Sequence, residues 1–164
     1  MTTFAHFDAG LDGASSRHRS SWKRRLGLAP PAEREALSIL RRGDILGLDV
    51  YPSIGWLDEN GRDRVAHAAP DQIVVVAGWR RIAGEQGKRL WVTEAQAEPW
   101  EARRSSHGEP VSVQPEAIPA LVDRLVGIGV ETILLWGSEY WLWREDNGEP
   151  RWIEAVSVIR KALA

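Results

Sequence analysis

GKRLWVTEAQAEPW, residues 87–100, is the stretch of the sequence that decides the predicted fold. Its first half, RLWVTE (89–94), is a short apolar run that predicts a buried strand. This strand ends on a carboxylate, Glu94, and the chain then continues directly through Gln, Glu, Pro and Trp. A carboxylate is costly to remove from water, so Glu94 is either a solvated strand end or a residue kept there for function, and we favour the functional interpretation.

The rest of the sequence alternates between short apolar runs and amphipathic segments. Within residues 70–87 the run IVVVAG is β-branched enough for a strand, but we favour a helix because the next strand follows so closely. Gly, Pro and aromatic residues fill the connections at 10–31, 53–69, 95–114 and 138–147, which we read as loops. The expected strands are 2–7, 44–52, 89–94 and 131–137, and the expected helices are 31–43, 70–87, 115–129 and 148–164.

A strand followed by a helix therefore occurs four times, with no clear sequence repeat. This order predicts the α/β class, in which parallel (β/α) units form a sheet covered by helices. The predicted loops after the strands are long and aromatic, whereas those before the strands are tight. In parallel α/β folds functional residues gather at the carboxyl ends of the strands, so the long loops mark the working face.

The composition is that of an ordinary globular protein. The 164 residues indicate a single domain, 1–164, with 43% hydrophobic and 27% charged residues. A formal net charge of −2 gives no reason to expect nucleic acid or a membrane surface as partner. The absence of cysteine excludes disulfides and thiolate chemistry. We expect neither a signal peptide nor a membrane span, and the compartment stays open.

Polar and aromatic residues gather at the expected strand ends. A carboxylate there can attack an anomeric carbon, and a neighbouring tyrosine hydroxyl can hydrogen-bond the carboxylate and orient it. An indole offers apolar area to the C–H face of a pyranose. The candidates are His6 and Asp8, Asp49 and Tyr51, Glu94, and Trp136 with Glu139. This set predicts a sugar site.

Three of these strand ends, DVYP, WVTEAQAEPW and LLWGSEYW, resemble the last three strands of clan A retaining glycoside hydrolases. The likeness is strongest to family five, the cellulase and mannanase group of TIM (β/α)8 barrels. The resemblance implies that Glu94 is the nucleophile, that Tyr51 orients it and that Trp136 is the floor of the sugar subsite. It covers most of the chain but only half of a barrel, strands five to eight.

The sequence departs from the family pattern at the acid/base. That residue is a Glu, usually after Asn, at the end of strand four, and this chain contains no Asn-Glu pair. Asn60 and Asn147 both lie in predicted loops. A complete barrel of this type needs about 250 residues. We therefore expect a half-barrel with unpaired edges and an uncovered inner face.

Further residues of the same loops are candidates for substrate binding. Gln96 strengthens the interpretation of Glu94, and Glu98 and Glu139 either bind sugar hydroxyls or are solvated acids. Trp100, Trp141 and Trp143 either line outer subsites or cap the core. Asp49 is two residues before Tyr51, so both side chains point to the same side of the expected strand. We therefore expect Asp49 to be buried and paired, as a structural residue. His6 is more typical of a core histidine than of a ligand.

No other chemistry is predicted. His18, His67 and His107 lack the spacing of metal ligands, and neither a phosphate-binding Gly-rich loop nor a nucleophile elbow occurs. The basic segment RHRSSWKRR (17–25) is balanced by nearby acids and reads as a solvated surface. We expect no metal and no organic cofactor.

Three hypotheses follow from the sequence. The first is a truncated glycoside hydrolase that hydrolyses β-glycosidic bonds of an oligo- or polysaccharide with retention, with Glu94 as nucleophile. The second is a half-barrel that pairs with itself, as a homodimer, or with a separate N-terminal half. The third is a carbohydrate-binding remnant without turnover.

Overall fold

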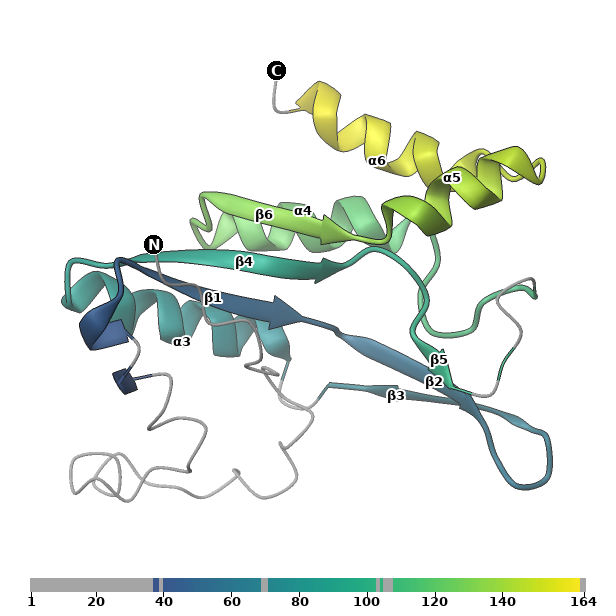
Figure 1. Cartoon of the computed structure of the whole chain (residues 1–164), viewed down its shortest axis with the longest axis horizontal. Helices are drawn as coiled ribbons and strands as arrows, with labels where there is room; N and C mark the ends of the chain where they lie inside the picture. The colour runs from purple at the N-terminus through teal and green to yellow at the C-terminus, as the bar shows by residue number, and fades with distance from the viewer. Residues whose placement is uncertain (1–36, 39, 69–70, 103, 105–107, 163–164) are drawn as a thin grey trace.

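The computed structural model describes residues 37–38, 40–68, 71–102, 104 and 108–162 (Figure 1). The predicted strand at 2–7 and the start of the first predicted helix lie outside these residues, and 37–38 and 40–42 are helical as expected. The elements are β1 Ile45–Val50, β2 Ser53–Leu57, β3 Asp63–His67, α3 Gln72–Glu85, β4 Arg89–Gln96, β5 Glu101–Ala102, α4 Ala117–Gly127, β6 Thr132–Trp136, α5 Ser138–Asp146 and α6 Arg151–Ala162.

The central sheet is parallel and has the order β1-β4-β6. In the chain, β2, β3 and α3 lie between β1 and β4, and β5 and α4 lie between β4 and β6. The α/β class with parallel strands is therefore confirmed, as is the helix predicted over 70–87. Figure 1 shows the smaller sheet β3-β2-β5 lying beyond the carboxyl ends of β1 and β4. The chain thus places extra structure at the end where we expected function.

The main core lies on one face of the central sheet. Alternate residues of β1, Leu46, Leu48 and Val50, are fully buried there. They pack with apolar residues of both crossover helices, including Val76 and Trp79 of α3 and Leu121 and Leu125 of α4. Both helices therefore cover the same face, as right-handed crossovers require when each new strand is added on the same side.

A second core lies between the helices at the C-terminal end of the described chain. Trp141 of α5 and Trp152 of α6 are buried with Ile118 of α4, together with Ala97 and Val113. This cluster fixes α5 against α4 and α6. It therefore also fixes the junction of β6 with α5, where Trp136 ends the strand and Glu139 lies in the first turn of the helix.

The loop predicted over 53–69 is wrong, because these residues form the antiparallel hairpin β2–β3. Asp58 begins the turn: its carboxylate accepts hydrogen bonds from the backbone N–H groups of Asn60 and Arg62, each at 2.9 Å. Gly61 has φ of 69°, which a residue with a Cβ adopts reluctantly. Asn60-Gly61 is a residue pair typical of hairpin turns, so this pair is the feature of the sequence that indicates the hairpin.

The Trp-rich loop predicted over 138–147 is also wrong, because α5 occupies it. One side of this helix is held by Arg144, whose Nε donates to the Tyr140 hydroxyl one turn earlier at 2.8 Å. Among the other loops, 95–114 contains the short strand β5, and β4 runs two residues further than predicted, to Gln96. In the part of the chain that the structure describes, no helix is long and apolar enough to span a bilayer.

Candidate active site

A β-bulge in β4 decides which way Glu94 points. Leu48 of β1 is opposite Val92, but the next residue, Asp49, is opposite Glu94, so β4 contains one extra residue at this point. The pairing of β4 with β6 shifts over the same residues. After the bulge Ala95 belongs to the buried core, so Glu94 faces away from α3 and α4. Bulges re-aim side chains in this way next to functional sites.

Tyr51 and Glu94 are brought together at the carboxyl ends of neighbouring parallel strands. The Tyr51 hydroxyl donates a hydrogen bond of 2.7 Å to Glu94 Oε2. This is the contact that the sequence predicted between these two residues. Burial raises the pKa of Tyr51 well above its ordinary value, and the hydrogen bond and negative charge of Glu94 raise it further. Tyr51 therefore stays protonated and remains a hydrogen-bond donor, which orients the Glu94 side chain.

Asp49, which is buried, and Thr93, which is partly buried, connect β1 to β4 close to this pair in the chain. Asp49 is 7% exposed, and the Thr93 hydroxyl donates to its Oδ1 at 2.9 Å. The predicted burial of Asp49 is confirmed. Thr93 is the residue added by the bulge, so its hydroxyl ties the distorted part of β4 to β1.

Gln96 has a structural position rather than the substrate-binding position predicted for it. It is 1% exposed, and its amide forms two bonds with the backbone of Ser53: the Ser53 N–H donates to Oε1 at 3.1 Å, and Nε2 donates to the Ser53 carbonyl at 2.7 Å. A side chain so enclosed cannot reach a sugar. Gln96 instead joins β4 to β2 and so fixes the segment that follows Tyr51.

Two indole side chains of the candidate site are about half exposed to solvent. Trp136, at the end of β6, is 51% exposed, and Trp100 is 53% exposed. The Trp100 ring lies 4.8 Å from the Tyr51 ring, centroid to centroid, with an angle of 56° between the planes. An exposed aromatic ring offers apolar area on which the C–H face of a sugar can pack.

Trp141 does not join them. It is 8% exposed within the second core, and its indole N–H donates to the Ala97 carbonyl at 2.6 Å. Of the two interpretations left open for this residue, the structure gives the core cap. Glu139, in the first turn of α5, is exposed, and its carboxylate accepts a bond of 3.2 Å from Ser138.

Glu98 lies between the Trp136 indole and a small cavity. The Trp136 side chain donates a hydrogen bond to its carboxylate. Burial raises the pKa of Glu98, the Trp136 bond opposes this, and the negative charge of Glu139 raises the pKa again. Gly137 makes the arrangement possible: its φ is 131°, and a Cβ there would lie 2.7 Å from the Glu98 Cβ.

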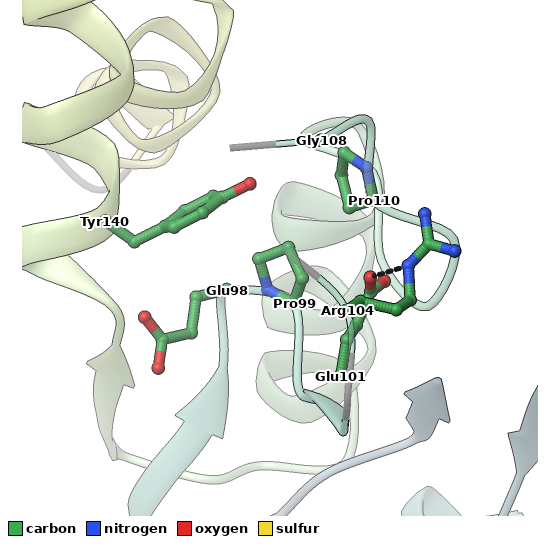
Figure 2. Close-up of a pocket in the computed structure, with 7 residues that line it drawn as sticks. All are labelled: Glu98, Pro99, Glu101, Arg104, Gly108, Pro110 and Tyr140. Atoms are coloured by element: carbon green, nitrogen blue, oxygen red, sulfur yellow. Dashed lines mark hydrogen bonds and ion pairs between the residues drawn. The ribbon is translucent and has the colours of Figure 1, made fainter. Parts of the chain in front are cut away.

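The cavity beside Glu98 has a volume of ≈ 190 Å³ (Figure 2). Its lining also includes Glu101, Arg104 and Tyr140, which the sequence analysis did not single out. Glu101 and Arg104 are three residues apart and form an ion pair of 2.7 Å. An acid and a base at this spacing are common on any protein surface, so their pattern in the sequence does not indicate a site.

The other predicted site residues have simpler outcomes. His6, Asp8, His18, His107 and the segment 17–25 lie outside the described residues. His67 lies on β3, and its Nδ1 is 2.8 Å from the Ser53 hydroxyl across the hairpin. The described part of the chain contains no group of three or more His, Cys, Asp or Glu that could hold a metal ion. Comparison with known protein families, with curated proteins and with solved structures finds no match.

Proposed function

We propose that this chain is the C-terminal half of a retaining glycoside hydrolase barrel, with Glu94 as the nucleophile and Tyr51 as the residue that orients it. The observation that carries the proposal is the 2.7 Å hydrogen bond from the Tyr51 hydroxyl to Glu94 Oε2. Both residues lie at the carboxyl ends of adjacent parallel strands, where (β/α)8 enzymes have their active sites.

The winding of the chain supports the barrel part of this proposal. Strands β1, β4 and β6 are neighbours in the order in which they occur in the chain. Both crossover helices pack on one face of the sheet. In a (β/α)8 barrel that face is the outside, and the opposite face, which carries Glu94 and Trp136, is the inside. An inner face with half-exposed Leu134 and Trp136 is what half of a barrel would present.

In the proposed reaction one Glu94 oxygen attacks the anomeric carbon and forms a glycosyl ester, while the bond from that carbon to the leaving oxygen breaks. A carboxylic acid about 5 Å away donates a proton to the leaving oxygen, and water then hydrolyses the ester. The Tyr51 hydroxyl holds the second Glu94 oxygen in position throughout. Trp136 and Trp100 offer the sugar apolar contact.

In the family the proton donor is a Glu that usually follows an Asn. The residues that the structure describes contain no such Asn-Glu pair. The proposal therefore assigns the proton donor to a partner half-barrel, either a second copy or a separate N-terminal half. The alternative is a carbohydrate-binding protein without turnover. Two half-exposed indoles, Trp136 and Trp100, of which Trp100 contacts the Tyr51 ring, favour that function if Glu94 forms no ester.

The test uses a substrate that needs no proton donor. A β-glycoside with dinitrophenolate as leaving group departs without acid catalysis, and a fluorine next to the anomeric carbon slows the hydrolysis of the ester. We expect intact-protein and peptide mass spectrometry to find one sugar on the peptide that contains Glu94, with at least one of the gluco, manno, xylo and galacto forms. Glu94→Gln should abolish the label, and Tyr51→Phe should slow labelling by roughly 10-fold or more, as for loss of one donor to the reacting group.

The matched control is Glu145→Gln, because Glu145 is exposed on α5, away from the Tyr51–Glu94 pair. This variant should label like the parent chain. If the four sugars leave no label although the chain still binds the corresponding oligosaccharides, the binding function replaces the enzymatic one. If the label is found on Glu145 or another carboxylate, the assignment of Glu94 is wrong.

A further inference from the structure

The chain contains two asparagines, Asn60 and Asn147, and a glycine follows each of them. In an Asn-Gly pair the backbone nitrogen of the glycine can attack the asparagine side chain, because glycine has no Cβ to hinder the approach. In both pairs the glycine N–H donates to a carbonyl at 3.0 Å, so this bond does not distinguish them. The two pairs are therefore chemically alike, and the surrounding structure is what separates them.

Asn60 lies at the tip of the β2–β3 hairpin, and Figure 1 shows this turn projecting away from the central sheet. The Asn60 side chain is exposed and makes no hydrogen bond within the part of the chain that the structure describes. Asp58 holds the turn: its carbonyl accepts from the Gly61 N–H, and its carboxylate accepts from the Asn60 and Arg62 N–H groups. These bonds join residues of the turn to one another, and such loop tips open at the lowest cost in free energy.

Asn147 is the C-cap of α5, and its side chain is already engaged. Its Nδ2 donates to the Trp143 carbonyl at 2.7 Å, and its N–H donates to the carbonyls of Trp143 and Arg144. The Glu149 N–H donates to the same Arg144 carbonyl at 2.8 Å, and Arg144 is 1% exposed. Freeing the Asn147 side chain for reaction would therefore disrupt the end of the helix beside a buried arginine.

We propose that Asn60 is a site of spontaneous deamidation in the folded protein, and that the end of α5 protects Asn147 from the same reaction. The Gly61 nitrogen forms a bond to Asn60 Cγ, the Cγ–Nδ2 bond breaks, and Nδ2 leaves as ammonia with the proton that the Gly61 nitrogen loses. Water then opens the five-membered imide at either carbonyl, which gives an aspartate in the normal linkage or one linked through its side chain. This inference goes beyond the proposed function and uses no residue of the Tyr51–Glu94 pair.

Either product changes the charge of the hairpin tip. A further carboxylate stands beside Asp58 and lowers the formal net charge of −2 by one. The side-chain-linked product also adds one carbon atom to the main chain between Leu57 and Asp63, which are paired across the hairpin. The other end of the hairpin, at Ser53, is held by the Gln96 amide, so we expect the change to stay at the tip.

The test incubates the full chain at mildly alkaline pH, where the glycine nitrogen loses its proton more readily, and follows both asparagines by peptide mass spectrometry. In the folded chain we expect Asn60 to react at least about 10-fold faster than Asn147, equivalent to a difference of 1.4 kcal/mol in the cost of local opening. In guanidinium chloride the two rates should differ by less than about 3-fold, because no tertiary contact then distinguishes the two sites.

Two variants locate the reaction. Asn60→Gln should remove the acidic product, because glutamine would have to form a larger ring, and Asn147→Gln should leave it unchanged. Equal reaction of both asparagines in the folded chain, or faster reaction of Asn147, would overturn the proposal. So would reaction of both in denaturant and of neither in the folded chain, because the turn would then protect Asn60. The same ratio of rates in denaturant as in the folded chain would overturn the structural explanation and assign the difference to the neighbouring residues.

Discussion

The two faces of the β1-β4-β6 sheet differ most at β6, whereas β1 is buried on both faces. On the face covered by α3 and α4, Leu48 and Val92 are completely buried. On the other face, Leu134 and Trp136 of β6 are about half exposed, at 50% and 51%, and Glu94 is only partly covered. Side chains alternate between the faces along a strand. One short strand can therefore serve stability with one set of residues and recognition with the other.

The bulge in β4 changes which side chains of this strand point to each face of the sheet. Without the extra residue, the alternation that buries Val92 would also turn Glu94 toward the helices, into the apolar core. An unpaired carboxylate there would cost several kcal/mol, roughly 3 or more. With the bulge, Glu94 faces Tyr51 on the open side, and Ala95 takes the buried position. The comparison teaches that a local irregularity, placed at one residue, can set the side on which an acid works.

The largest expected effect tests the covered face. Leu48→Ala should lower the free energy of unfolding by about 2–5 kcal/mol, because it leaves a cavity in a fully buried position. Glu94→Gln, two positions from Val92 but on the open face, should change it by less than about 0.5 kcal/mol. Urea denaturation of both variants at one pH measures the difference. Similar losses in both would mean that the open face also carries the stability of the fold.

A smaller effect is expected where the open face meets α5. Gly137 has φ of 131°, and a Cβ there would meet the Glu98 Cβ at 2.7 Å. Gly137→Ala should therefore cost on the order of 1–3 kcal/mol in strain and displace Glu98 from Trp136. Gly84→Ala in α3 is the matched control, since a Cβ there meets nothing within 4 Å. The control should stabilise the protein by about 0.5–1 kcal/mol. Equal effects on the thermal midpoint would refute this account of the turn.

The smallest effect concerns proton binding and needs no substitution to detect. The chain contains two tyrosines, Tyr51 and Tyr140, and burial raises the pKa of each above its ordinary value of 10.0. Ultraviolet titration of the folded protein should therefore find no phenolate near pH 10, whereas in denaturant both should titrate there. Because the unfolded chain releases these protons first, the free energy of unfolding should fall as the pH rises above about 10. Tyr51→Phe should remove part of this dependence.

Much of the fold could be predicted because the strands and crossover helices carry strong local patterns. β1 and β6 are mostly apolar, β4 contains the apolar run LWV, and α4 is amphipathic and ends at Gly127. The hairpin β2–β3 was missed because β3, DRVAH, is almost entirely exposed and lacks an apolar pattern. Helix α5 was missed because SEYWLWRED is rich in aromatic residues, and its stability comes from contacts of Arg144 and Trp141 with distant backbone groups.

The candidate site divides in the same way. The meeting of Tyr51 with Glu94 followed from their places at the ends of two expected neighbouring strands. The burial of Gln96 and Trp141 did not follow, because each is held by a carbonyl from another part of the chain. Nothing local distinguishes a glutamine or tryptophan that reaches solvent from one whose partner arrives through the tertiary fold.

The sequence by itself determined the alternation of strands and helices, and hence a parallel sheet with polar residues at the carboxyl ends of its strands. Hydrophobic periodicity is a local property and can be read without knowing which segments meet. Only the tertiary structure decided the face on which each side chain lies after the bulge, because the register of β4 depends on its two neighbouring strands at once. It also decided that Glu98 lies between the Trp136 indole and the cavity, because β4, β6 and α5 must be packed together before that contact exists.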